Sequence, residues 1–264
     1  MKIFDANMID SLNRIQLKFV FLGHSTVNKS WRGRVEAPTY SRLYYVAGGS
    51  AVITAENERH QLIPGKWYLL PSGMSFDYEC EKSLNHVFFH LRLCGMSGLD
   101  LLGKCGSIIS VSDFGIAKRI ANRSFCGLSD ALELRGLIMT VLGSMLENQA
   151  VNFDETTLSP CTAAAIRFIN DNASFALTPE QVAESAFVSK STLDKHFRAE
   201  LGTSVGKYID DAVFFKALRL ISIGGLSLRD ISERLGFSDQ FYFSKKFKAR
   251  YGITPREYKK KPLA

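Results

Sequence analysis

Short apolar runs separated by turn residues fill the chain between Tyr40 and Leu93. Tyr, Val, Ile and Phe dominate the runs, while Gly, Pro and Asn separate them, as in RLYYVAGG, SAVITAENE, KWYLLPSG and HVFFHLRL. Turn signals at such short intervals are typical of antiparallel strands that follow one another along the chain. The pattern therefore predicts a small β-barrel or β-sandwich.

The spacing of apolar residues along the chain changes after Leu128. Apolar residues recur every three to four positions from Leu134 to Leu146, and this spacing predicts an amphipathic helix over about residues 129–149. A shorter helix is expected before it, around residues 113–123. The apolar stripe of the longer helix has two interpretations. It covers the barrel of its own chain, or it pairs with the same helix of a second subunit.

The remainder of the chain is predicted to be helical, and capping residues mark the starts of several helices. Each start places an N-cap oxygen before a proline at the first helical position, at Ser159-Pro160, Thr178-Pro179 and Thr254-Pro255. The stretch AVNFDETTLS, residues 150–159, is polar and aperiodic enough to act as a linker. We therefore expect an α+β organisation, with a β-barrel and trailing helices in residues 1–158 and an all-helical domain in residues 159–264.

The helical domain contains a weak internal repeat. The segment that starts at Thr178 matches the segment that starts at Ser227 at an offset of 49 up to a turn and of 50 after it. Apolar and glycine positions repeat, whereas exposed positions differ. The repeated pairs include Val182 and Ile231, Leu193 and Phe243, Phe197 and Phe247, and Gly202 and Gly252. Each copy predicts a short helix, a turn and a second helix, which together form a helix-turn-helix.

Positive charge is concentrated in the same domain. The chain has a formal net charge of +7; residues 159–264 contain 17 Lys and Arg against 11 Asp and Glu, whereas residues 1–158 contain 16 against 15. Such an excess favours an anionic partner, nucleic acid first and a membrane surface second. No apolar run approaches the roughly 18 residues that a membrane helix needs, and the first residues lack a signal-peptide core. We expect a cytoplasmic protein.

The second helix of the second copy combines rings and cations. Burial of Phe243 and Phe247, four residues apart, leaves Lys245 and Lys248 on the other sides of the helix. The rings would anchor the helix from beneath, and the lysines would point toward the phosphates and base edges of a DNA groove. A basic, solvated face on an ordinary helical bundle is the alternative interpretation.

The second copy resembles the signature of the AraC/XylS family of bacterial transcription regulators. The resemblance runs through LSLRDISERLGFSDQFYFSKKFKARYGITPREY, and with the looser first copy it covers about residues 160–261. It implies two helix-turn-helix units, joined by a long helix over residues 205–221, that enter neighbouring major grooves of double-stranded DNA. It further implies a homodimer and RNA polymerase as a partner in activation. We favour the dimer for the stripe at residues 129–149, since two subunits double the contacted sites.

The resemblance also assigns roles to single residues of the two recognition helices. Base-facing positions fall on Ser191, Asp194, Lys195, Gln240, Phe241 and Lys245, and backbone-facing positions on Thr192, Arg198, Tyr242 and Lys246. The chemistry suits these roles, since Lys donates to guanine, Gln pairs with adenine, Asp accepts from cytosine and a ring packs on a thymine methyl. For Asp194 a second interpretation stays open, in which its carboxylate holds Lys190 or Arg198.

The first domain resembles the cupin-like ligand barrel of AraC-type regulators, most clearly in IPGKWYLLPSGMSFDYE. The resemblance implies control by a small-molecule effector, with a carbohydrate as the candidate, because an aromatic ring stacks on a sugar and an imidazole binds its hydroxyls. Packing residues on a barrel strand are the alternative interpretation for the histidines. The candidate effector-binding residues are Tyr78, His86, Phe88, His90, Arg42 and Trp31.

A metal-dependent cupin enzyme fused to a helical nucleic-acid-binding module is the competing function. Such enzymes need two closely spaced histidines, a glutamate and a later histidine around one ion. The stretch WRGRVEAPTYSRLYYVAGG holds no His-x-His, and His60, His86 and His90 are scattered. The five cysteines form no C-x-x-C pair. We expect no enzymatic activity, no metal and no cofactor.

Overall fold

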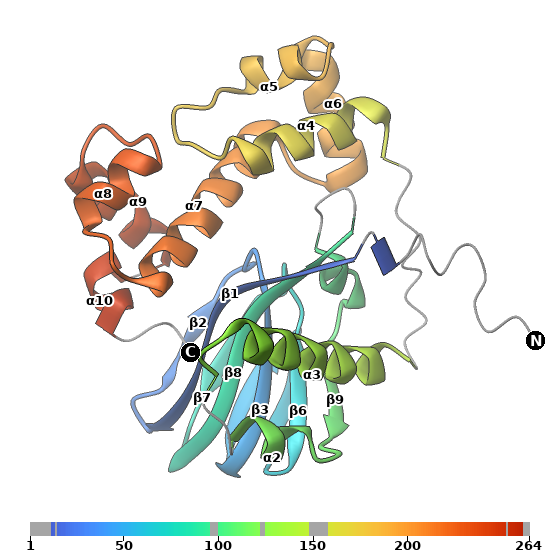
Figure 1. Cartoon of the computed structure of the whole chain (residues 1–264), viewed down its shortest axis with the longest axis vertical. Helices are drawn as coiled ribbons and strands as arrows, with labels where there is room; N and C mark the ends of the chain where they lie inside the picture. Colours follow the sequence, from blue (N-terminus) through green and yellow to red (C-terminus); the bar gives the residue numbers. More distant parts are fainter. Residues whose placement is uncertain are drawn as a thin grey trace, which may run out of the picture. The chain divides into compact units, whose positions relative to one another are not determined.

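The computed structural model describes residues 12–13, 15–95, 100–121, 125–147, 158–251 and 253–260 of the chain. The chain forms two compact units, Met1–Phe153 and Asp154–Ala264 (Figure 1). Most of the predicted linker, residues 150–157, lies outside the described residues, as does Gly252 of the internal repeat.

The first unit contains two antiparallel β-sheets, which confirms the predicted β-rich half. One sheet has the strand order β1-β8-β3-β6-β9, and the other has the order β2-β7-β4-β5. The strands of the first sheet are β1 (Gln16–Asn28), β8 (Ser83–Cys94), β3 (Ser41–Gly49), β6 (Lys66–Leu70) and β9 (Ile109–Ser112). Those of the second are β2 (Arg32–Val35), β7 (Phe76–Glu79), β4 (Ala51–Ala55) and β5 (Glu58–Leu62).

Three of these strands lie outside the stretch in which sequence patterning predicted strands. β1 and β2 precede it and β9 follows it. β1 is an edge strand that pairs along its length with β8. Only Leu17 and Val20 are buried in β1, and exposed and half-buried residues alternate in its second half. An edge strand that is half polar gives a weaker periodic signal than the buried strands beside it.

Alternation along the strands divides the first sheet into two buried faces. Leu43 of β3, together with Phe89 and Leu91 of β8, lies on the outer face. Residues at alternate positions of the same strands, such as Tyr44 and His90, lie on the inner face, which the second sheet covers. A strand buried on both faces is rich in large apolar residues, as HVFFHLRL is.

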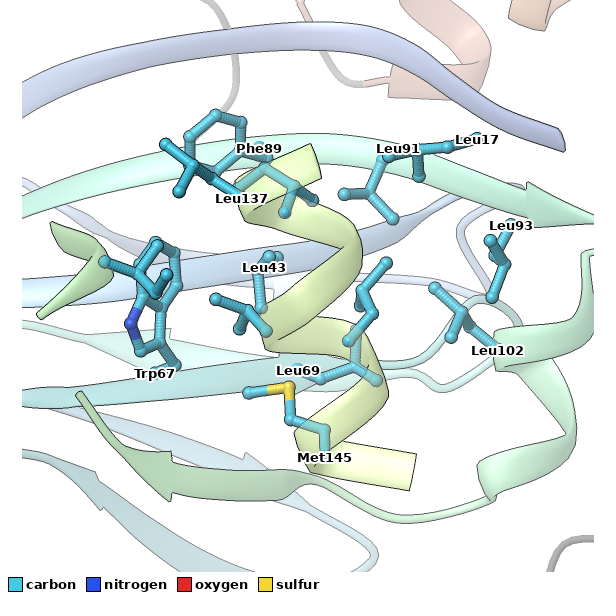
Figure 2. Packing of buried hydrophobic residues seen from close by; sticks show 14 of the residues in the cluster. Leu17, Leu43, Trp67, Leu69, Phe89, Leu91, Leu93, Leu102, Leu137 and Met145 are labelled. Carbon is cyan, nitrogen blue, oxygen red and sulfur yellow. The ribbon is translucent and has the colours of Figure 1, made fainter. Parts of the chain in front are cut away.

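Helices α2 (Ile116–Ala121) and α3 (Leu128–Leu146) follow the strands, together with a short 3-10 helix at Leu101–Cys105. The stripe of α3 packs on the outer face of the first sheet. Figure 2 shows Leu137 and Met145 of α3 beside Leu43 and Leu69 of the sheet. The buried stripe comprises Leu134, Leu137, Ile138, Val141, Leu142 and Met145. Because its own chain occupies this stripe, the interpretation of the stripe as a subunit interface is wrong.

The second unit is all-helical in its described residues. Its helices are α4 (Pro160–Asp171), α5 (Pro179–Ser185), α6 (Lys190–Leu201), α7 (Val205–Ile223), α8 (Leu228–Arg234), α9 (Gln240–Tyr251) and α10 (Pro255–Lys260). The Ser/Thr-Pro starts of α4, α5 and α10 are confirmed. The N-cap oxygens of Ser159, Thr178 and Thr254 accept the backbone N–H three residues later at 3.4, 3.3 and 3.2 Å.

The two predicted helix-turn-helix units are α5–α6 and α8–α9, and α7 is the predicted long connecting helix. Figure 1 shows α7 running from α6 toward the α8–α9 pair. No helix among the described residues is both long and apolar enough to cross a membrane.

Candidate nucleic-acid interface and ligand site

The second recognition helix, α9, is fixed at its start and along its buried face. The Asp239 carboxylate accepts hydrogen bonds from the backbone N–H groups of Phe241 at 2.8 Å and Tyr242 at 2.7 Å, which caps the helix. Phe243 and Phe247 are both fully buried, with ring centres 5.8 Å apart. The rings therefore anchor the helix, as the sequence indicated.

The opposite sides of α9 present rings and cations to solvent. Phe241 is 76% exposed and Tyr242 is 36% exposed, and both are close to the start of the helix. Lys245 and Lys246 are exposed, with Lys246 Nζ 5.6 Å from the ring centre of Tyr242. Gln240 is half-buried. An exposed Phe beside lysines at one end of a helix suits contact with a base methyl and nearby phosphates.

Arg250, near the end of α9, ties this helix to α7. Its guanidinium donates to the carboxylate of Asp211 and lies 5.1 Å from the ring centre of Phe214. Both charged side chains are mostly buried, with exposed fractions of 26% and 20%. An ion pair buried to this extent fixes the orientation of the recognition helix on the connecting helix.

The first recognition helix, α6, repeats this arrangement with other residues. Ser189 caps it, since its hydroxyl accepts the backbone N–H of Thr192 at 3.2 Å. Leu193 and Phe197 are fully buried. The exposed side comprises the predicted contacts Ser191, Thr192, Lys195 and Arg198.

Asp194 of α6 binds the backbone at the start of the next helix. Its carboxylate accepts the backbone N–H of Val205, the first residue of α7, at 3.1 Å. Lys190, one of its predicted partners, instead donates to Glu180 of α5 at 2.6 Å. Glu180 raises the pKa of Lys190, and the charge of Asp194 adds to this rise; the hold of Asp194 on Lys190 or Arg198 stays a prediction. Sequence spacing within one helix could not identify Glu180, which lies ten residues earlier.

The turn of the first helix-turn-helix contains a residue that sequence analysis did not select. Phe187 has a φ of 56° and is 95% exposed. The internal repeat aligns it with Gly236 of the second turn, whose φ is 76°. A left-handed backbone is ordinary for glycine but strained for phenylalanine. The alignment of a phenylalanine in one copy with a glycine in the other was the sequence signal that could have identified this turn.

The six candidate effector-binding residues converge between the two sheets of the first unit. Trp31 lies 4.5 Å from Tyr78 of β7 and 6.1 Å from His86 of β8, measured between ring centres. His86, Phe88 and His90 follow one another along β8 at 5.4 and 5.5 Å. Arg42 of β3 places its guanidinium 5.3 Å from the ring centre of Phe76 on the other sheet.

Two glycines make room for the rings in this interior. A Cβ atom on Gly23 would lie 2.9 Å from the ring of Phe88, and one on Gly33 would lie 2.8 Å from the hydroxyl of Tyr78. Each glycine is the cross-strand partner of the ring that lies over it. Tyr44, opposite His86 at 5.4 Å, and Tyr40, stacked on His90 at 5.0 Å, complete the interior.

Several polar atoms of this interior are buried without a hydrogen-bond partner among the described residues. They include Trp31 Nε1, the hydroxyl of Tyr44 and both ring nitrogens of His90. Burial raises the pKa of Tyr44. Burial and the neighbouring His24 lower the pKa of His86 to about 4, and burial and Arg42 lower the pKa of His90 well below its ordinary value. The tyrosine is therefore protonated and the histidines neutral at pH 7.

Buried polar groups without partners are rare in folded proteins, and a cluster of them suits a polar ligand. Among the described residues, no group of three or more His, Cys, Asp and Glu side chains could hold a metal ion.

The chain is similar to known regulators of bacterial operons, and the similarity extends over both units. Residues 182–261 match the helix-turn-helix domain family. The chain is 25% identical to the lactose operon transcription activator of Staphylococcus xylosus over 272 residues, which cover 98% of this chain and 93% of that protein. It is 24% identical to the Msm operon regulatory protein of Streptococcus mutans, across 97% of this chain and 95% of that protein.

The fold has a counterpart among solved structures. ToxT from Vibrio cholerae superposes with a TM-score of 0.61 at 13% identity, across 93% of this chain and 98% of that structure. At this identity the likeness concerns the fold alone, namely antiparallel sheets followed by helices and a helix-turn-helix domain.

Proposed function

The chain is a transcription regulator of the AraC/XylS family, and on this premise we propose that α6 and α9 read double-stranded DNA while a small molecule between the two sheets controls them. The observation that carries the proposal is the pair of capped helices, each anchored by buried apolar residues and each with an exposed basic side. Two such helices on one connecting helix suit two major grooves of one duplex.

We propose the following contacts for the exposed side chains. Ser191, Lys195, Gln240, Phe241 and Lys245 face base edges, and Thr192, Arg198, Tyr242 and Lys246 face the phosphate backbone. Lysine donates to guanine, glutamine pairs with adenine, and the 76% exposed ring of Phe241 packs on a thymine methyl. Asp194 is left out of this set because its carboxylate is held by the start of α7.

The effector is proposed to bind in the interior formed by Trp31, Arg42, Tyr78, His86, Phe88 and His90. Buried polar atoms and aromatic rings from both sheets support this position. The name of one full-length relative, the transcription activator of a lactose operon, favours a carbohydrate. Ligand binding would alter the arrangement or the availability of the recognition helices.

The remaining partners follow from this role. The protein acts in the cytoplasm as a homodimer and, in activation, contacts RNA polymerase; it catalyses no reaction. Because the buried stripe of α3 is occupied, the dimer would use the outward side of that helix, on which Leu128 is 78% and Leu132 is 62% exposed.

Gel shifts of Lys195→Ala and Lys245→Ala on operator DNA across a salt series test the DNA-binding role. Each change should weaken specific binding by roughly 1–3 kcal/mol, because each removes one base contact. Lys29→Ala, in the other unit, is the control and should leave affinity unchanged. Unaltered binding by both recognition-helix variants would show that the two helices do not enter the grooves.

A further inference from the structure

Arg42 places a positive charge in the interior between the two sheets. Its side chain is 2% exposed, and its guanidinium carbon lies 4.9 Å from the ring centre of Tyr40 and 5.3 Å from that of Phe76. The field of this charge reaches two tyrosines of the interior. Burial raises the pKa of Tyr44 and of Tyr78, and the positive charge of Arg42 partly offsets both increases. An anion between these side chains would therefore meet a favourable field.

Two hydrogen-bond donors lie in the same interior as Arg42, beside histidines whose neutral rings each offer one donor and one acceptor nitrogen. The indole Nε1 of Trp31 can only donate, and the same holds for every nitrogen of a guanidinium. Trp31 Nε1 and the Tyr44 hydroxyl are buried and have no hydrogen-bond partner among the described residues. Both rings contact His86, at 6.1 and 5.4 Å between centres, so the two donors belong to one small region. A ligand oxygen that accepts hydrogen bonds would satisfy both, because the indole only donates and the tyrosine hydroxyl can donate.

We propose that the effector carries a carboxylate, which binds to Arg42 and to the donors Trp31 Nε1 and Tyr44 hydroxyl. The inference rests on the proposed function, since it specifies the chemistry of the ligand in the same interior. A sugar acid combines this group with a ring that can lie against Trp31 and Tyr78, which are 4.5 Å apart between ring centres.

A neutral sugar satisfies the same donors less well. A hydroxyl oxygen accepts from Trp31 and Tyr44, but it gains little from a buried cation, whereas attraction between opposite charges rises steeply as water is excluded. Hydrogen bonds to an ionised acceptor are also roughly twice as strong as neutral ones. The acid of a matched pair should therefore bind at least about tenfold more tightly than its neutral partner.

Calorimetric titration of the full chain with matched pairs tests this difference. The probes are D-glucose with D-glucuronate and D-galactose with D-galacturonate, since each acid keeps the ring of its neutral partner. The expected result is that at least one acid binds about tenfold or more tightly than its neutral partner. Equal or tighter binding by the neutral sugars, or no binding by any acid of the panel, overturns the inference.

Single substitutions test which side chains cause the preference for an acid over its neutral sugar. Arg42→Gln should bring the ratio of acid to neutral affinity close to one, while Arg59→Gln, which removes a 66% exposed arginine of β5, should preserve it. Trp31→Phe and Tyr44→Phe each keep a ring and remove one hydrogen-bond donor. They therefore test the proposed carboxylate contacts even if Arg42→Gln does not fold. Each should weaken the acid about tenfold.

The variants also separate this inference from the proposed function. A neutral sugar that binds and is lost in Tyr44→Phe would leave the interior as the effector site and remove only the carboxylate. An acid preference that survives in folded Arg42→Gln, Trp31→Phe and Tyr44→Phe would contradict the inference, and gel shifts with operator DNA test the recognition helices independently.

Discussion

The carboxylate of Asp194 accepts the backbone N–H of Val205 at 3.1 Å, so the first recognition helix holds the start of the connecting helix. This hydrogen bond satisfies one of the free N–H groups at the start of α7, and Ser204 satisfies another by accepting from Lys207 at 3.3 Å. A carboxylate at this position also suits the positive end of the α7 dipole. Asp194 is thus a positioning residue.

Replacement of Asp194 should separate positioning from base recognition. Asp194→Ala should lower the free energy of unfolding by about 1 kcal/mol, as the loss of a helix cap does, whereas Asp194→Asn keeps an acceptor oxygen and should lose less than half of that. Thermal unfolding measures the first effect. Selection from randomised operators measures the second: Asp194→Asn should keep the base preference of the parent, and a changed preference at a single base pair would assign Asp194 to direct readout.

The turn of the first helix-turn-helix should become more stable when glycine replaces Phe187. Phe187 has a φ of 56° and its side chain is 95% exposed, so Phe187→Gly relieves a strained backbone and loses little packing. Relief of about 1–2 kcal/mol exceeds the entropic cost of glycine of about 0.5–1 kcal/mol. The melting temperature should therefore rise. Phe187→Ala is the matched control, since it keeps the left-handed strain and should change stability little.

The equivalent turn of the second copy should respond in the opposite direction. Gly236 has a φ of 76°, and a Cβ atom there would meet the side chain of Ser174. Gly236→Ala should therefore destabilise the second unit by more than about 1 kcal/mol. A rise in melting temperature for Gly236→Ala, or a fall for Phe187→Gly, would contradict this account of the two turns.

The stability of the first unit should fall as the pH drops from about 6.5 toward 4. Burial and His24 lower the pKa of His86 to about 4, and burial and Arg42 lower that of His90 as well. The unfolded chain therefore takes up protons first, and His86 alone should lower the free energy of unfolding by roughly 2–3 kcal/mol across this range. Asp100 acts in the opposite direction, because burial raises its pKa. The contribution of the histidines must thus be obtained by difference.

Tryptophan fluorescence can follow this unit alone, since the two tryptophans of the chain are Trp31 and Trp67. Urea unfolding between pH 4 and 7 should show a smaller loss of stability in His86→Gln and His90→Gln than in the parent. His60→Gln, in which a half-buried histidine is replaced, is the control. The same loss in all four proteins would show that other groups determine the pH dependence.

The parts of the fold that sequence predicted are those that depend on local chemistry. Thr178 and Gln181 lie within one helical turn of each other, so the start of α5 is visible in a few residues. The contacts that escaped prediction join distant segments: Glu180 reaches Lys190 from another helix, and Arg42 lies on the ring of Phe76 from another sheet. The family resemblance marked the candidate interior residues, but only the pairing of β8 with β3 and the facing of the sheets brings them together.

The two sides of α3 should respond differently to a charge. Ile138 is fully buried against the first sheet, whereas Leu132 is 62% exposed. Ile138→Glu should unfold the first unit, because an unpaired carboxylate in an apolar core costs several kcal/mol, while Leu132→Glu places its carboxylate in solvent and should leave the unit folded. Sedimentation then tests the proposed dimer: Leu132→Glu should shift the chain from dimer to monomer, and Thr140→Ala, on an exposed position of the same helix, should not. A parent chain that sediments as a monomer, or a Leu132→Glu variant that stays dimeric, would exclude this side of α3 as the subunit interface.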